Sequence, residues 1–173
     1  MSLRLAFWLA FAAATVVYLA MVLWALPIIS GDAGGLMPFD LRPFGYTTDE
    51  ARMFLSALGD TGRAQYLGPQ HKLDTLYPGL LALSLILAYF LLFPPRWAIG
   101  FASIAALGAI FDWNENSAVA DLLRLGVDRI DEEVVSIAAL FTMLKSVTVT
   151  VALSIFLAGV MFAVWQRWRR QTG

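Results

Sequence analysis

The chain has 173 residues, of which 60% are hydrophobic and only 14% are charged. A soluble domain of this length normally carries about 25% charged and about 45–50% apolar residues, so the excess of apolar residues predicts an integral membrane protein. The net charge of −1 and the lack of a basic stripe argue against a nucleic-acid partner. There is no cysteine and a single histidine, His71, which excludes a zinc–thiolate site, a cysteine nucleophile and a two-histidine haem site within one chain. We therefore expect neither a metal nor a cofactor.

Four apolar stretches predict four membrane-spanning helices, at residues 5–29, 75–93, 97–119 and 134–165. A helix crosses a bilayer with about 20 residues at 1.5 Å per residue. The first stretch is too long for the apolar core of a signal peptide, so we expect it to be retained as a span. The second ends at Pro94-Pro95, and the third reaches span length only by including polar residues.

The connection at residues 30–74 is predicted to be partly structured. Gly31–Gly45 is rich in glycine and proline and indicates an irregular loop. Thr47 followed three residues later by Glu50 has the spacing of a capping box, which predicts the start of a short amphipathic helix. A second short helical piece is expected from Thr61 to Leu67, ending at Gly68-Pro69.

The charges predict the orientation of the spans. Short basic segments without acidic residues occur at the N-terminus, in the turn after Pro94-Pro95 and in the C-terminal tail, whereas all 13 acidic residues lie elsewhere. Basic residues in short loops favour the cytoplasmic side, so both termini are predicted to be cytoplasmic. The arginines concerned are Arg4, Arg96, Arg167, Arg169 and Arg170.

These patterns together predict one all-α domain covering residues 1–173. We expect a four-helix transmembrane bundle in a bacterial inner membrane, with the short amphipathic helices capping its outer, periplasmic face.

Ionisable residues on three different spans are predicted to lie at one depth. Asp74 precedes the Pro94 turn by about 20 residues, Glu115 follows that turn by a similar number, and Lys145 precedes the cytoplasmic Trp165 by about 20, so each lies roughly 28–30 Å above the inner face. This level is close to the outer limit of a hydrocarbon core about 30 Å thick.

The third span presents its polar residues on one side. Asp112, Glu115 and Asn116 are spaced i, i+3 and i+4, so they share one helix face. Charges at membrane depth normally face the interior and pair. Lys145 is the only basic residue within any span and is the expected partner of Glu115 or Asp112. Two acids beside one lysine leave one carboxyl group over, which could stay protonated or act as a base.

Two residues of the outer connection, Arg63 and Tyr66, are expected to reach the same group from above. The candidate ligand-binding set is therefore Arg63, Tyr66, Asp74, Asp112, Glu115, Asn116 and Lys145. Two other interpretations stay open at this point. The cluster could be a structural network that locks the helices together, or its members could reach the interface separately without contact.

Several of these residues belong to motifs with a wider resemblance. Gly62-Arg63 with Tyr66, Asp74 with Tyr77-Pro78, Asp112-x-x-Glu115-Asn116 and Phe141-Thr142-x-x-Lys145 resemble a pattern in small bacterial four-helix membrane proteins, over roughly Gly45 to Lys145. No established activity attaches to that family, so the resemblance implies the fold and the cluster but no function.

Three functions remain in competition at this point. The first is binding or processing of a lipid headgroup, an isoprenoid or another small amphiphile in the outer cluster, with catalysis left open. The second is a non-catalytic scaffold or accessory subunit with a membrane partner. The third is a transporter, which with four spans would need a homo-oligomer.

Overall fold

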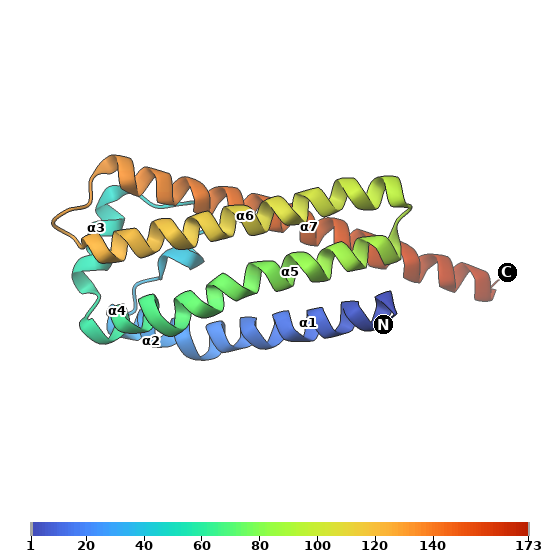
Figure 1. Cartoon of the computed structure of the whole chain (residues 1–173), viewed down its shortest axis with the longest axis horizontal. Coiled ribbons are helices and arrows are strands. Elements are labelled where there is room, and N and C mark those ends of the chain that lie inside the picture. Colours follow the sequence, from blue (N-terminus) through green and yellow to red (C-terminus); the bar gives the residue numbers. More distant parts are fainter. Residues whose placement is uncertain (1, 173) are drawn as a thin grey trace.

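The computed structural model describes residues 2–172, and these residues form helices without any strand (Figure 1). The longest helical segments lie side by side and share one long axis (Figure 1). The α-helices are α1 (Leu3–Ala20), α2 (Leu26–Asp32), α3 (Thr48–Ala57), α4 (Asp60–Gln65), α5 (His71–Leu92), α6 (Pro95–Leu125) and α7 (Glu132–Thr172).

Two of the long segments contain a π-helical turn. The turn Met21–Ala25 (η1) joins α1 to α2, and the turn Tyr66–Gln70 (η3) joins α4 to α5. Each turn lies next to or around a proline, Pro27 or Pro69. Proline lacks an N–H and clashes with the preceding helical turn, and the wider π turn accommodates this locally.

The prediction that a short helix ends at Gly68-Pro69 is therefore wrong. The chain passes through this dipeptide within η3, where the N–H of His71 donates to the carbonyl of Tyr66 five residues earlier. The helix that begins at Asp60 consequently runs on without a break to Leu92.

Three helical segments within residues 2–172 are long and apolar enough to cross a membrane: Leu3–Asp32, Asp60–Leu92 and Glu132–Gln171. They correspond to the first, second and fourth predicted spans. The third, α6, is continuous through 31 residues but is not among them, because Asp112, Glu115 and Asn116 lower its mean hydropathy. Its helix ends at Gly126, which takes a φ of 74° that disfavours other residues.

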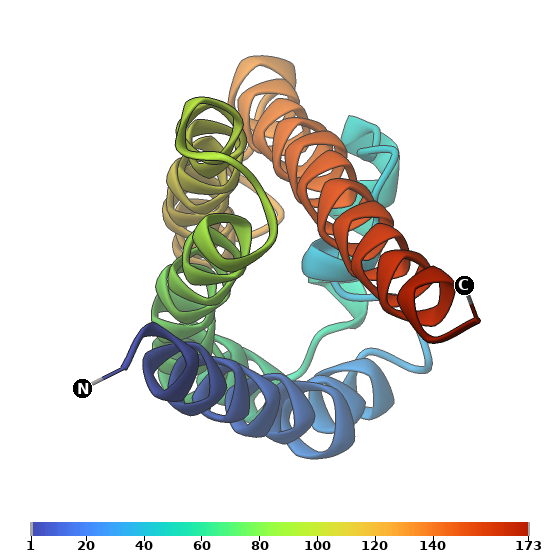
Figure 2. The ribbon, with the colours of Figure 1, turned by 90° about the vertical axis from the view of Figure 1, so that its right-hand side faces the viewer.

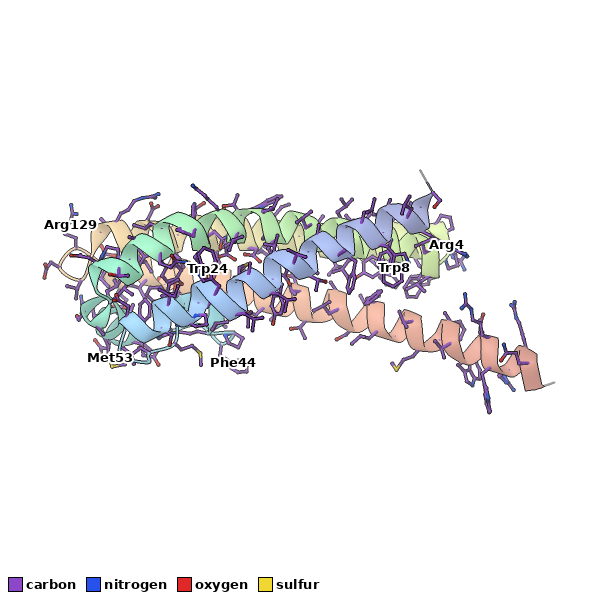
Figure 3. All side chains as sticks on the ribbon, turned by 90° about the horizontal axis from the view of Figure 1, so that it is seen from below. Arg4, Trp8, Trp24, Phe44, Met53 and Arg129 are labelled. Carbon is purple, nitrogen blue, oxygen red and sulfur yellow. The ribbon has the colours of Figure 1, made fainter. Side chains whose placement is uncertain are left out.

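The long helices pack against one another in the order in which they follow along the chain. Seen end-on, α5 lies between α1 and α6, and α6 lies between α5 and α7 (Figure 2). The α5–α6 turn and both chain ends lie at one end of the molecule, with the last turns of α7 extending beyond the other helices (Figure 1). The helices α3 and α4 lie at the opposite end, and Figure 3 likewise shows Arg4 and Trp8 far from Met53 and Arg129.

The helix start predicted from the capping box at Thr47 is confirmed, and α7 also begins with a side-chain cap. Thr47 accepts from the N–H of Glu50, and the Glu50 carboxylate accepts from the Thr47 N–H at 2.7 Å, which completes the capping box at the start of α3. At the start of α7, the Asp131 carboxylate accepts from the N–H of Val134 at 3.0 Å.

Polar links hold the α3–α4 end to the long helices. Asp32, in the last turn of α2, accepts from the N–H of Gly62 at 2.8 Å. Any Cβ at Gly62 would lie 2.6 Å from the same carboxylate, so only glycine permits this approach. Arg52 of α3 donates to the carbonyl of Ile130, just before α7.

Candidate functional site

An ion-pair cluster joins α6 to α7. The Lys145 ammonium group donates to the Glu115 carboxylate and lies 3.4 Å from the Asp112 carboxylate. The side chains are 12%, 0% and 7% exposed for Lys145, Glu115 and Asp112. The predicted pairing of Lys145 with the acidic residues of the third span is therefore confirmed, and the lysine forms an ion pair with each of the two carboxylates.

The Glu115 side of this cluster is dry. The second carboxylate oxygen of Glu115 accepts from the Thr142 hydroxyl at 2.8 Å, and Thr142 is itself fully buried. Lys145 and Thr142 stand three residues apart on α7, so they reach Glu115 from successive turns. With both carboxylate oxygens bonded and no exposed surface, Glu115 has the environment of an anchor between helices.

Asp74 and Asn116 join α5 to α6. The Asn116 side chain donates to the backbone carbonyl of Asp74 at 2.7 Å, and both residues are about 95% buried. A free carbonyl at this point of α5 is expected, because Pro78 four residues later cannot donate to it. The third and second predicted spans are thus linked at the level of the ion pairs.

A cavity of about 250 Å³ adjoins the ion pairs. Its wall combines an apolar part from α1, α2, α5 and α7 with a polar part from three helices and the loop before α3. The apolar side chains include Met21, Leu26, Leu81 and Val149, and the ionisable ones are Asp40, Asp74, Asp112 and Lys145. Tyr18 and Thr150, on α1 and α7, also line it and are exposed, so the rim of the cavity lies on the side of the helices.

Asp40 is a site residue that the sequence prediction missed. It lies in the short 3-10 turn Phe39–Leu41 (η2), which the fully buried Phe39 anchors in the core. Arg42 donates twice to the carbonyl of Met37, at 2.6 and 3.0 Å, and so closes the loop on itself. The only sequence signal was an isolated acid among apolar residues in a stretch interpreted as an irregular loop.

Two buried tyrosines lie next to the cluster on its α3–α4 side. Tyr66 is 3% exposed and faces Asp40, whereas Tyr46 is 8% exposed and lies beside Thr142. Burial raises the pKa of the Tyr46 hydroxyl, so this group stays a neutral donor at physiological pH. The prediction that Tyr66 lies above the cluster agrees with this placement.

Arg63 lies apart from the ion pairs. Its guanidinium group donates to the backbone carbonyl of Leu123, in the last turn of α6. A basic group at a helix C-terminus satisfies a free carbonyl and complements the helix dipole. The arginine therefore ties α4 to α6, while the other six predicted site residues gather around the cavity and the ion pairs.

A second, water-sized cavity of about 10 Å³ shares Asp40 and Asp74 with the first. Tyr66, Asn116 and His71 also line it. Within residues 2–172, His, Asp and Glu side chains form no group with the arrangement of a metal site.

The arrangement can hold a polar group of a ligand beside an apolar wall, or stabilise the helices through buried ion pairs. Its dry part, at Glu115, fits the second role, and its cavity-lining part, at Asp112, fits the first. Comparisons with protein-family models, curated proteins and solved structures find no match to this chain. The resemblance to small bacterial four-helix proteins therefore stays a prediction.

Proposed function

We propose that this chain is a four-span protein of a bacterial inner membrane that binds the headgroup of a small amphiphile in the cavity beside Lys145. The observation that carries the proposal is the composition of the cavity wall, which places ionisable groups at one end and apolar side chains along the rest. This is the distribution that an amphiphile itself has.

We infer that α6 also crosses the membrane, as the third span in chain order. Its 31 residues reach about 46 Å at 1.5 Å per residue, which exceeds a hydrocarbon core of about 30 Å. Its polar residues Asp112, Glu115 and Asn116 are buried against α5 and α7, whereas Ile99 and Ile110 are 59% and 46% exposed. A helix with this distribution would show lipid an apolar surface.

The positions of the basic residues indicate which end of the molecule faces the cytoplasm. The end that carries Arg4 and the α5–α6 turn with Arg96 is cytoplasmic by the positive-inside rule. The opposite end, with α3 and α4, is then periplasmic and forms a cap over the ion-pair cluster.

The size and position of the cavity favour a headgroup over a whole ligand. A volume of about 250 Å³ is below the roughly 300–1,000 Å³ of sites that enclose a drug-sized molecule. The rim at Tyr18 and Thr150 lies on helices that would face lipid, so an acyl or isoprenoid chain could remain in the bilayer while its headgroup enters.

Native mass spectrometry of protein released in mild detergent, with lipid extraction and identification, tests this function. We expect an amphiphile to remain bound to the native chain and to be lost when Thr150→Trp or Ser146→Phe fills the cavity. Val151→Trp is the matched control, since Val151 is also exposed on α7 but does not line the cavity. A native chain that retains no amphiphile, or retention unchanged in both filled variants, would contradict the proposal.

The competing structural role makes a different prediction for two acids of the cluster. Glu115→Gln should lower stability, because Glu115 is fully buried and paired. Asp112→Asn should weaken retention of the amphiphile while the folded yield stays close to that of the native chain, because Asp112 lines the cavity. Equal loss of fold in both variants would favour a network with a structural role alone.

A further inference from the structure

The cavity wall carries more carboxyl groups than basic groups. Asp40, Asp74 and Asp112 reach it from η2, α5 and α6, and Lys145 is the one basic residue that lines it. That lysine already serves two carboxylates, Glu115 and Asp112. Within the cavity, Asp40 and Asp74 are therefore left without a cation of their own.

The nearest arginines do not supply the missing charge. Arg42 donates to the carbonyl of Met37, and its guanidinium group lies 5.6 Å from the centre of the Phe39 ring. Arg63 donates to the carbonyl of Leu123. Both are held by backbone carbonyls, and neither forms an ion pair with Asp40 or Asp74 among the described residues.

Buried hydrogen-bond acceptors at the same place also lack a donor. Both carboxylate oxygens of Asp40 and the side-chain oxygen of Asn116 are buried without a hydrogen-bond partner in residues 2–172, and so is the Tyr66 hydroxyl. Tyr66 and Asn116 are 3% and 4% exposed and line the water-sized cavity that shares Asp40 and Asp74 with the larger one. Buried polar groups are nearly always satisfied, and the Tyr66 hydroxyl can donate to only one of these three acceptors, so the other two lack a donor among the residues that line the two cavities.

Two aromatic rings also line the cavity. Tyr18 of α1 and Tyr77 of α5 both line the cavity, with ring centres 5.7 Å apart. The faces of aromatic rings attract cations. They therefore add to the preference for positive charge that the carboxylates create.

We propose that the cavity takes the ammonium headgroup of an amphiphilic primary amine, with Asp40 and Asp74 as its carboxylate partners. A primary ammonium group offers three donors and no acceptor, which matches a wall that has acceptors to spare. This inference rests on the proposed function and names the class of its ligand.

The test is competition among four amphiphiles with the same 12-carbon chain: dodecylamine, dodecyltrimethylammonium, dodecanol and dodecanoate. The full-length protein is incubated with an equimolar mixture in mild detergent, and the bound species are counted by native mass spectrometry. We expect dodecylamine to exceed each of the others by about tenfold or more, because hydrogen bonds to charged groups are the strong ones. The quaternary ion carries the charge without the N–H donors and should come second.

Charge-removing variants assign the binding to the named carboxylates. Asp40→Asn and Asp74→Asn should each reduce the dodecylamine signal by about tenfold. Asp128→Asn removes the same charge from an exposed residue at the same end of the molecule and should leave it unchanged. A melting curve for each variant separates loss of binding from loss of fold.

The outcomes distinguish failure of this inference from failure of the proposed function. If dodecanol or dodecanoate binds as well as dodecylamine, or if the two cavity variants bind dodecylamine normally, the cationic class is wrong while amphiphile binding stands. If none of the four binds but the native chain retains an extracted lipid, only the inference fails. If neither a retained lipid nor any of the four is found, both proposals fail.

Discussion

Replacing Lys145 by methionine tests how strongly the buried ion pairs hold α6 to α7. Methionine keeps an unbranched side chain of similar length but removes the ammonium group that serves Glu115 and Asp112. Asp112 lines the cavity and can be hydrated there, whereas Glu115 is 0% exposed. The penalty should therefore come mainly from Glu115.

The magnitude of this penalty is set by the free energy needed to protonate Glu115 in the folded variant. A glutamate with the ordinary pKa of about 4.3 can be neutralised at pH 7 at about 1.36 kcal/mol per pH unit, or about 3.7 kcal/mol in all. Removing one partner of a buried ion pair typically costs about 3–5 kcal/mol. We expect Lys145→Met to lower the free energy of unfolding by about 3–4 kcal/mol at pH 7.

The same reasoning fixes the sign of the pH dependence. In the variant, the folded state holds a protonated Glu115 while the unfolded state is ionised above about pH 4.3, so the penalty grows as the pH rises. At pH 5 it should shrink to about 1 kcal/mol. The double variant Lys145→Met/Glu115→Gln should recover most of the loss at pH 7, because no buried charge remains at Glu115.

Denaturation by sodium dodecyl sulfate, followed by circular dichroism at pH 5 and pH 7, measures these values. Arg124→Met is the matched control: its ion pair with Asp121 is about 60% exposed on both sides, and exposed pairs contribute about 0–1 kcal/mol. A loss below about 1 kcal/mol for Lys145→Met at pH 7, or a loss that does not depend on pH, would refute the ion-pair argument.

Three further perturbations test other parts of the structure. Gly62→Ala should lower stability by about 1–3 kcal/mol, because its Cβ would lie 2.6 Å from the Asp32 carboxylate and from Leu58, whereas Gly100→Ala has nothing within 4 Å and should be neutral or stabilising in the same melting assay. Thr47→Ala should lower stability by about 1 kcal/mol through loss of the α3 cap. Hydrogen bonds from the backbone N–H and the hydroxyl of Thr47 lower the pKa of Glu50, so the carboxyl NMR signal of Glu50 should titrate below its ordinary value in the native chain and move only part of the way back in the variant, which keeps the backbone N–H. That part of the stability is present above the ordinary pKa and is lost as the pH falls through the lowered one. Tyr89→Phe removes the 2.7 Å bond to the carbonyl of Ala152 and should cost about 0.6–1 kcal/mol in the same denaturation experiment; no loss would show that the bond contributes nothing.

Local rules predicted much of the fold. The apolar runs predicted three helices of spanning length, and Thr47 with Glu50 predicted the start of α3, because both signals are contained in a short stretch of consecutive residues. The Lys145 pairing was predictable for a similar reason. The rise per residue of a helix gives the depth of each side chain along the helix axis. Lys145 is the only basic residue within the predicted spans, so it was the expected partner of acidic residues at the same depth.

What the sequence did not predict depends on contacts between distant segments. Asp40 joins the cavity because the buried Phe39 and the Arg42 bonds fold its loop inward, and no periodic pattern encodes that fold. The partner of Arg63 is a backbone carbonyl, which every residue carries, so side-chain chemistry could not identify it. The break expected at Gly68-Pro69 did not occur because a π turn absorbs the proline.

The two π turns change the phase of the helices that contain them. Each contains an i→i+5 bond in place of i→i+4, which amounts to one additional residue, and each residue of an α-helix advances by about 100° around the axis. The side chains after Met21–Ala25 are therefore rotated about the helix axis relative to those before it, and the same holds on either side of Tyr66–Gln70. The turns contact each other, so α1 and α5 both change phase at the same level, immediately beside the cavity. Deleting one residue from Met21–Ala25 would restore a regular helix and rotate α2, with the loop that carries Asp40, relative to α1; deleting one from Tyr66–Gln70 would rotate α5 relative to α4 in the same way.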